Sequence, residues 1–153
     1  ADTVEQGYAF SNCLDDLLIL EMAVKMYYPD YADDYDKYIK NGPNLYYYNG
    51  FIMKAEDYDR YFEFLFNCLN GYLKLAGIKS EKDLIEHVKY NLEVGKYQRY
   101  PDPKRVPNEA IKWQCSIGGF LSERLWTLWL QHNFSDDKVL KLPYIKMEDN
   151  MYT

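Results

Sequence analysis

The sequence is poor in the residues that build metal sites and disulfide frameworks. It contains three cysteines and two histidines, lacks a CxxC pair, and places His87 and His132 far apart. A structural zinc ion needs about four Cys or His ligands, usually at close spacing, so we expect no zinc site here. The cysteines are interpreted as buried, reduced thiols. HExxH, a glycine-rich phosphate loop and a supported Ser-His-Asp order are missing too, which disfavours zinc-protease, P-loop and serine-hydrolase chemistry.

Long apolar runs and an excess of positive charge are also absent. The apolar runs have only a few residues each, far below the roughly 20 that cross a bilayer. Against 18 Lys and Arg stand 24 Asp and Glu, and the resulting charge of −6 argues against nucleic-acid binding. No signal peptide is recognised, and a start at Ala1 without Met indicates a segment of a longer parent. We therefore predict a cytoplasmic protein without a transmembrane segment, and we leave peripheral membrane contact open.

Tyrosine is the abundant residue. The chain has 153 residues, of which 48% are hydrophobic and 18% aromatic, including 17 tyrosines. This length suits one domain that buries roughly 70% of the surface exposed by its unfolded chain. A tyrosine joins an apolar ring to a hydroxyl, so it suits a surface that binds sugars, or a helix face with the ring inward and the hydroxyl outward. Both interpretations remain open.

Apolar periodicity predicts several helices. The first begins at Asn12 and turns Leu14, Leu17, Leu18, Met22 and Met26 toward the core. The clearest helix spans about 56–74, and Ser80 with Asp83 forms a capping box for the next. The helices are expected over about 13–28, 31–39, 56–74, 81–93 and 120–132.

Two segments read as strands, and between the helices lies an extended loop. Residues 45–53 are rich in β-formers and predict a central, kinked strand, and residues 139–145 predict a short closing strand. The proline-rich stretch 96–108 predicts an exposed loop, whose Lys104 and Arg105 are either solvated or meet anionic lipid-linked acceptors. The predicted fold is therefore α+β: mainly helical, with a few-stranded sheet.

Two Asp-x-Asp triplets raise the question of a divalent metal. Carboxylate oxygens suit Mn²⁺ or Mg²⁺, and such triplets hold the metal in glycosyltransferases of the GT-A type. However, Asp34-Tyr35-Asp36 is expected in a helix, where side chains two residues apart diverge by about 200°. Asp57-Tyr58-Asp59 is expected in a helical first turn, where acids are favoured by the helix dipole. Neither triplet is assigned as a metal site.

Ser122-Glu123-Arg124 is the stronger candidate for chemistry. Gly118-Gly119 just before it would let the backbone turn sharply and approach a ligand. Glu123 could then act as a general base on a sugar hydroxyl, and Arg124 could bind a phosphate through two hydrogen bonds. The alternative is a pair of ordinary surface residues near a helix start. His132, at the other end of this helix, is expected to complement the helix dipole.

Three segments, read together, are similar to one known family. They are LYYYNGFIMK (45–54), DRYFEFLFNCL (59–69) and GFLSERLWTLW (119–129). They resemble the C-terminal part of a bacterial family of domains of unknown function from capsular, exopolysaccharide and lipopolysaccharide loci, grouped with GT-A nucleotide-sugar glycosyltransferases. The stretch Ser122 to Leu125 is the most specific part of the resemblance. The family's N-terminal half, with its nucleotide pocket and metal-binding carboxylates, is missing before Ala1.

The resemblance implies that residues 1–153 form a single domain or segment, the acceptor-side part of a GT-A-like α/β domain with a helical insertion at about 75–115. The parent would transfer a sugar from a nucleotide-sugar donor to a glycan or lipid-linked acceptor, and a divalent Mn or Mg ion is compatible with it. Glu123 would be catalytic, while Asn49, Tyr48, Arg124 and Ser122 would bind substrate. We expect the segment alone to be inactive. A non-catalytic carbohydrate-binding or protein-interaction module, and an unrelated acidic helical interaction domain, remain alternatives.

Overall fold

The computed structural model describes residues 3–46 and 51–140, and it is helical throughout these ranges. Helices account for 73% of the described residues, and no strand occurs among them. The prediction of an α+β fold with a few-stranded sheet, and with it a GT-A-like α/β frame in this segment, is therefore wrong. The elements are α1 (Val4–Ser11), α2 (Leu14–Tyr27), η1 (Pro29–Tyr31), α3 (Ala32–Asp34), the π-helical η2 (Tyr35–Lys40), α4 (Ala55–Leu75), α5 (Glu81–Glu93), η4 (Pro103–Arg105), α6 (Asn108–Gln114), α7 (Ile117–Asn133) and η5 (Asp136–Lys138).

The segment predicted as a central strand packs on a helix instead. Of residues 45–53, 47–50 lie outside the described ranges, and the others form an extended connection without strand pairing. The amide of Tyr46 donates to the hydroxyl of Thr127 on α7, at 3.0 Å, rather than to a neighbouring strand. The ring of Phe51 lies 4.5 Å from that of Trp126. Tyr46 and Phe51 thus contact α7 and are half-buried, whereas Ile52 is exposed. Of the predicted closing strand only Val139 and Leu140 are described, and they form no strand.

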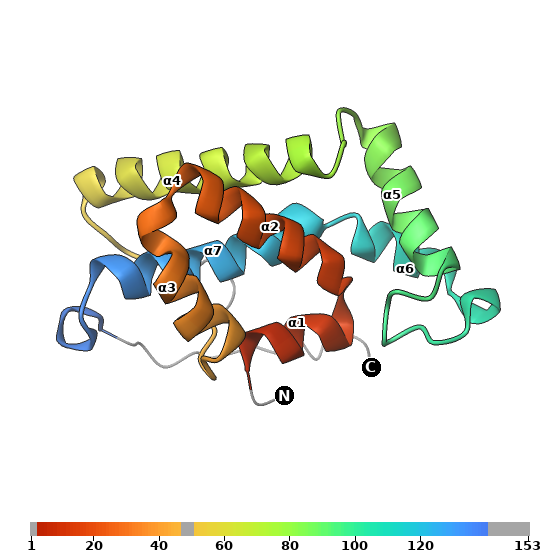
Figure 1. Ribbon diagram of the computed structural model, residues 1–153, viewed down its shortest axis with the longest axis horizontal. Helices are drawn as coiled ribbons and strands as arrows, with labels where there is room; N and C mark the ends of the chain where they lie inside the picture. Colours follow the sequence, from red (N-terminus) through yellow and green to blue (C-terminus); the bar gives the residue numbers. More distant parts are fainter. Residues whose placement is uncertain (1–2, 47–50, 141–153) are drawn as a thin grey trace, which may run out of the picture.

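Three helices form the body of the molecule. Helix α2 packs mainly against α4, and α4 packs against α7. Helix α1 and the α3–η2 segment close the remaining sides, while α5 and α6 pack against each other at the far end of α4 (Figure 1). Gly71 allows the close approach of α2 and α4, because a Cβ atom there would come within 2.6 Å of the Tyr27 ring.

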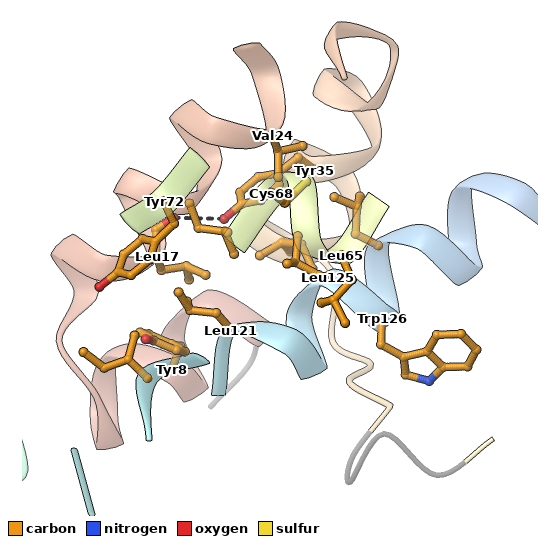
Figure 2. Close-up of a cluster of buried hydrophobic side chains, with 14 of the residues drawn as sticks. Tyr8, Leu17, Val24, Tyr35, Leu65, Cys68, Tyr72, Leu121, Leu125 and Trp126 are labelled. Carbon is orange, nitrogen blue, oxygen red and sulfur yellow. Dashed lines mark hydrogen bonds between the residues drawn. The ribbon is translucent and has the colours of Figure 1, made fainter. Parts of the chain in front are cut away.

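The core lies between α1, α2, α4 and α7, where side chains from all four helices meet (Figure 2). Tyrosines supply much of it: the Tyr35 hydroxyl, for example, donates to the carbonyl oxygen of Leu17 at 3.0 Å inside the protein. Several tyrosines therefore belong to the interior rather than to a sugar-binding surface. The largest fully buried side chains are Trp129, Tyr8, Tyr35, Tyr61, Tyr72, Tyr97, Phe64, Leu17, Leu20, Ile39, Leu121 and Leu125.

The inward face of α2 differs from the predicted one. Leu17 is buried as expected, but Leu18, Met22 and Met26 are exposed. The helix instead buries Asp16, Leu17, Leu20, Ala23 and Val24. A helix with apolar residues nearly all round has no unique apolar stripe, so periodicity alone could not select its buried face.

The other helical predictions fared better. Helices α4 and α5 are confirmed, and the Ser80 hydroxyl accepts from the amide of Asp83 at 3.2 Å, as the capping box predicted. Helix α2 begins one residue later than Asn12 would give, since Cys13 occupies the cap position. Helices α1 and α6 were not predicted, and α6 begins at the end of the stretch expected to be a loop.

Candidate functional site

Helix α7 carries the predicted catalytic stretch, but the glycines before it do not form a turn. The helix begins at Ile117, so Gly118 and Gly119 lie in its first turn and take helical conformation. Both are exposed, and a Cβ atom on either would meet nothing within 4 Å. The prediction that a sharp glycine turn delivers Glu123 is therefore wrong. Instead, Glu123 owes its position to the regular helix.

The Glu123 carboxylate is held by its neighbour in the chain. Its Oε2 atom accepts a hydrogen bond from Nη1 of Arg124 at 2.9 Å, and the Glu123 side chain is 18% exposed. Arg124 is buried: Nη1 also donates to the carbonyl of Phe120 at 2.8 Å, and the guanidinium lies over the ring of Tyr8, 4.9 Å from its centroid. Arg124 thus connects α7 to α1 and fixes the carboxylate of Glu123.

Ser122 is bound to its own helix. Its hydroxyl donates to the carbonyl of Gly119 at 2.7 Å, a local bond that a serine one turn into a helix commonly makes. Of the other predicted substrate-binding residues, Tyr48 and Asn49 lie outside the described ranges. Their placement relative to Glu123 therefore stays a prediction.

The chain just before Tyr48 runs along the same helix as Glu123. The Thr127 hydroxyl donates to the Glu123 carbonyl at 3.0 Å and accepts from the Tyr46 amide at the same distance. One turn further, Nε2 of Gln131 donates to the hydroxyl of Tyr46 at 3.1 Å. The 44–46 segment is thus attached to α7 within two turns of Glu123.

A half-buried phenylalanine and an exposed tryptophan lie on the other side of Glu123. Phe120 precedes Glu123 by three residues, so the two share a face of α7. The Phe120 ring is 5.6 Å from that of Trp113 on α6, and Trp113 is 56% exposed. Trp126 and Trp129, by contrast, are buried. Trp113 is therefore the tryptophan of this chain with a surface on which a sugar ring could stack.

The Asp-x-Asp triplets make ion pairs. Asp34 accepts from Nδ1 of His132 at 2.7 Å, whereas Asp36 approaches Lys25 and Lys40. Asp57 pairs with Arg60 at 3.3 Å. Within residues 3–46 and 51–140, no group of three or more His, Cys, Asp or Glu side chains could hold a metal ion. His132 does more than complement the helix dipole, because its ring also stacks on Tyr31 at 3.6 Å.

A buried polar cluster around Asp16 was not predicted. Oδ1 of Asp16 accepts from the Tyr72 hydroxyl at 2.8 Å and lies 2.7 Å from Nε2 of His87, while Asn91 contacts the same His87 nitrogen at 3.1 Å. Burial, and then the negative charge of Asp16, raise the pKa of the Cys13 thiol to about 11. The sequence signal was ambiguous, since an acid in a first helical turn usually only complements the dipole.

Burial and the Asp16 charge also keep neighbouring tyrosines neutral. Both effects, burial first, raise the pKa values of Tyr8, Tyr72 and Tyr97 well above the ordinary tyrosine value. Oδ2 of Asp16 and the hydroxyls of Tyr8 and Tyr97 are buried without a hydrogen-bond partner among the described residues. Asp16 is thus held by a few directed hydrogen bonds, and Tyr8, Tyr72 and Tyr97 beside it carry no charge at neutral pH.

Residues 1–88 match the family described as a domain of unknown function, DUF4422, and the chain belongs to this family. The matched part includes α1, α2, α4 and the first half of α5, with Asp16, Tyr72 and His87. Ser122, Glu123 and Arg124 lie beyond it. No curated protein and no solved structure matches the chain. None of the described helices combines the length and the apolar character needed to cross a membrane.

Proposed function

We propose that this chain is the acceptor-side part of a glycosyltransferase, which moves a sugar from a nucleotide-sugar donor to a glycan or lipid-linked acceptor. Glu123 is the general base in this proposal. The acceptor hydroxyl forms its new bond to the anomeric carbon, the bond to the leaving nucleoside diphosphate breaks, and the hydroxyl proton passes to the Glu123 carboxylate. The proposal starts from the resemblance of 45–54 and 119–129, without the α/β frame, because the described residues contain no strand.

The observation that carries the proposal is the composition of one face of α7. Phe120, Glu123, Thr127 and Gln131 follow each other at intervals of three and four residues and so share this face. Trp113 beside Phe120 supplies an exposed ring on one side of Glu123, and Tyr46 lies on the other. Aromatic rings next to a carboxylate are the parts that an acceptor sugar needs for stacking and for hydrogen bonding of its hydroxyl.

The proposal divides the other predicted residues into two roles. Arg124 is a positioning residue, since its guanidinium already contacts Glu123, Phe120 and Tyr8. Ser122, Tyr48 and Asn49 remain proposed substrate contacts, near the carboxylate or on the segment that continues from Tyr46.

One observation favours a second function, a non-catalytic carbohydrate-binding module. The Glu123 carboxylate is paired with Arg124 at 2.9 Å, and a paired carboxylate is suited to accepting a hydrogen bond from a sugar without taking its proton. The two functions differ in one measurable respect. Only the transferase requires the basicity of Glu123, whereas both require the aromatic surface of Trp113.

The test is sugar transfer by the complete protein as its gene encodes it. Glu123→Gln should lower kcat by at least about 100-fold, the usual contribution of a general base, and leave the urea unfolding midpoint nearly unchanged. Trp113→Ala should mainly raise the KM for the acceptor. Glu86→Gln and Tyr90→Ala, at exposed positions of α5, are the matched controls and should change neither constant.

Near-normal turnover of a folded Glu123→Gln variant would remove Glu123 from the mechanism. If glycan binding persisted in that variant and no transfer occurred even in the unmodified protein, the binding module would replace the transferase. Gly118→Ala offers a further check, because its Cβ would meet nothing and an alanine stabilises a helix by up to about 1 kcal/mol. Loss of transfer in this more stable variant would indicate that a ligand approaches the bare backbone there.

A further inference from the structure

A hollow lies at the C-terminal end of α7, the end opposite the glycines. Its volume is about 250 Å³. Glu123 does not line it, and Gln131 is its nearest lining residue along the helix, eight positions further on and thus about 12 Å away. Its lining residues are Tyr38, Gln131, His132, Asn133, Phe134, Ser135 and Asp136.

The wall of this hollow is held rigidly by bonds to other elements. His132 is fixed by Asp34 through Nδ1 at 2.7 Å and by stacking on Tyr31 at 3.6 Å. Asn133 donates to the Tyr31 hydroxyl at 2.9 Å and accepts from Nη2 of Arg60 at 2.8 Å. Three other elements, η1, α3 and α4, thus set the orientation of two lining side chains, which is the preorganisation that a small-ligand site requires.

These bonds leave a set of acceptors in the lining. A carboxylate can only accept, so Asp34 assigns the proton of neutral His132 to Nδ1 and leaves a lone pair on Nε2. Among the hydrogen bonds of residues 3–46 and 51–140, none uses Nε2 of His132, Oε1 of Gln131 or the carboxylate of Asp136. The last carbonyls of a helix are further acceptors without partners inside the helix. A ligand for this hollow must therefore donate several hydrogen bonds.

The charge of the lining narrows the ligand further. It contains Asp136 but no Lys or Arg, and it lies at the negative end of the α7 dipole. Both features disfavour phosphate and carboxylate ligands. A neutral molecule with several hydroxyl groups fits the acceptors, and the Tyr38 and Phe134 rings offer apolar contact to its C–H groups.

We infer that this hollow binds a neutral sugar residue, with Asp136, Gln131 and His132 accepting hydrogen bonds from its hydroxyls. The identification of this sugar as part of the acceptor glycan rests on the proposed function. Gln131 connects the two regions, because it lines the hollow and also donates to Tyr46 on the face that carries Glu123. An acceptor chain would then be held at the hollow while another of its residues lies near Glu123.

The test is an NMR titration of the ¹⁵N-labelled chain with glucose, galactose and N-acetylglucosamine, with inorganic phosphate and methylammonium as the anionic and cationic probes. At least one neutral sugar should shift the resonances of residues 131–136 and of Tyr38, and phosphate should not. Asp136→Ala should weaken that binding about tenfold, because it removes a charged acceptor. Asp59→Ala, at an exposed position of α4, is the matched control and should leave it unchanged.

Shifts caused by methylammonium alone, by phosphate, or by none of the probes would overturn the inference. An Asp136→Ala variant that binds the sugar as well as the unmodified chain would overturn it too. Glu123→Gln separates the two proposals, since it should leave binding at the hollow unchanged. Sugar binding at the hollow without Glu123-dependent transfer would therefore contradict only the proposed transferase function. Glu123-dependent transfer without sugar binding at the hollow would contradict only the proposed sugar site.

Discussion

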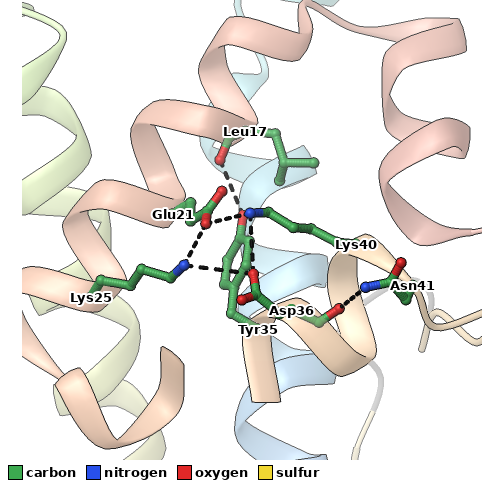
Figure 3. Close-up of polar contacts among 7 residues, drawn as sticks. All are labelled: Leu17, Glu21, Lys25, Tyr35, Asp36, Lys40 and Asn41. Atoms are coloured by element: carbon green, nitrogen blue, oxygen red, sulfur yellow. Dashed lines mark hydrogen bonds and ion pairs between the residues drawn. The ribbon is translucent and has the colours of Figure 1, made fainter. Parts of the chain in front are cut away.

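Two acids on α2, five residues apart, show how differently burial treats a negative charge. Asp16 is 1% exposed and is met by a tyrosine hydroxyl and a histidine ring. Glu21, whose side chain is 12% exposed, is met by the ammonium groups of Lys25 and Lys40, each 2.6 Å from Oε1 (Figure 3). The same two lysines approach Asp36, at 3.5 and 3.1 Å. Asp16 therefore depends on directed hydrogen bonds inside the protein, and Glu21 depends on two partly exposed lysine side chains.

The two environments of Asp16 and Glu21 indicate which charged groups stabilise the fold most. A buried charge that loses a partner costs about 3–5 kcal/mol, because nothing replaces the lost solvation. A surface ion pair contributes about 0–1 kcal/mol, since water and salt screen it. We therefore expect the Asp16 cluster to be needed for folding and the Glu21 network to be nearly dispensable.

The largest effect is expected for Asp16→Ala. It strips the Tyr72 hydroxyl and His87 of a buried acceptor and should lower the free energy of unfolding in urea by about 3 kcal/mol or more. Asp15→Ala is the matched control: this neighbouring acid is 46% exposed and pairs with Lys96, so it should cost less than about 1 kcal/mol. Equal losses from the two variants would contradict the comparison.

Tyr72→Phe should have the next largest effect. Its hydroxyl donates to a carboxylate, and such a bond contributes about 1.5–3 kcal/mol. Tyr35→Phe removes an equally buried hydroxyl that donates to a neutral carbonyl, and it should cost about 1 kcal/mol by the same denaturation measurement. If Tyr35→Phe cost more than Tyr72→Phe, the charge of Asp16 would not be what distinguishes the cluster.

Alkaline pH should weaken the region around Asp16 through Cys13. Its pKa is raised from 9.0 to about 11 in the folded protein, so between these values the folded state keeps a proton that the unfolded chain releases. Its contribution is complete below pH 9 and is lost as the pH rises toward 11, at up to about 1.4 kcal/mol per pH unit.

From pH 8 upward, the free energy of unfolding should fall less steeply with pH in Cys13→Ala than in the unmodified chain. It should fall least steeply in Cys13→Ala/Cys68→Ala, since burial raises the pKa of Cys68 to about 12. Cys115→Ala, at a half-buried thiol, is the control and should change the slope less. An unchanged slope in the double variant would mean that other groups govern the alkaline loss.

The smallest effect is expected for Glu21→Gln. It removes the shared acceptor of Lys25 and Lys40 and should cost about 1 kcal/mol or less at low salt, and still less as salt screens the remaining charges. The hydrogen bond to Glu21 is the largest cause of the raised pKa of Lys25 and of Lys40. In Glu21→Gln the pKa values of both lysines should therefore fall toward normal. A large, salt-independent loss of unfolding free energy would mean that Glu21 stabilises the fold as a buried charge does, like Asp16.

The sequence predicted helices well where one apolar stripe stands out. Helix α4 was expected at about 56–74 and spans Ala55–Leu75, and Tyr61, Leu65 and Tyr72 of its expected apolar residues are buried, whereas Tyr58, Phe66 and Leu73 are exposed. It predicted the inward face of α2 poorly, because Leu18, Met22 and Met26 have the same spacing as the residues actually buried. The strand at 45–53 failed for another reason: β-forming residues favour contact with a packed surface, and Tyr46 and Phe51 contact helix α7 rather than a neighbouring strand.

The candidate site was predicted only in part. The sequence singled out Glu123 and the segment around Tyr46, and α7 brings the two within two turns of each other. It did not reveal that Arg124 points into the interior, that Trp113 is exposed, or that His132 meets Asp34, 98 residues away. These facts depend on tertiary contacts between elements distant in sequence, for which neither spacing nor residue type gives a signal.

The packing of α7 against α4 has a practical meaning for anyone who would cut the chain at the end of its matched family region. A fragment ending at residue 88 would keep Tyr61, Phe64 and Leu65 but lose Leu121, Leu125 and Trp129, with which they form a common core. The side chains of α4 that pack against α7 would then be exposed to water. A fragment intended for expression should therefore extend at least to Asn133, the end of α7. The end of the family match at residue 88 does not coincide with the end of the folded unit.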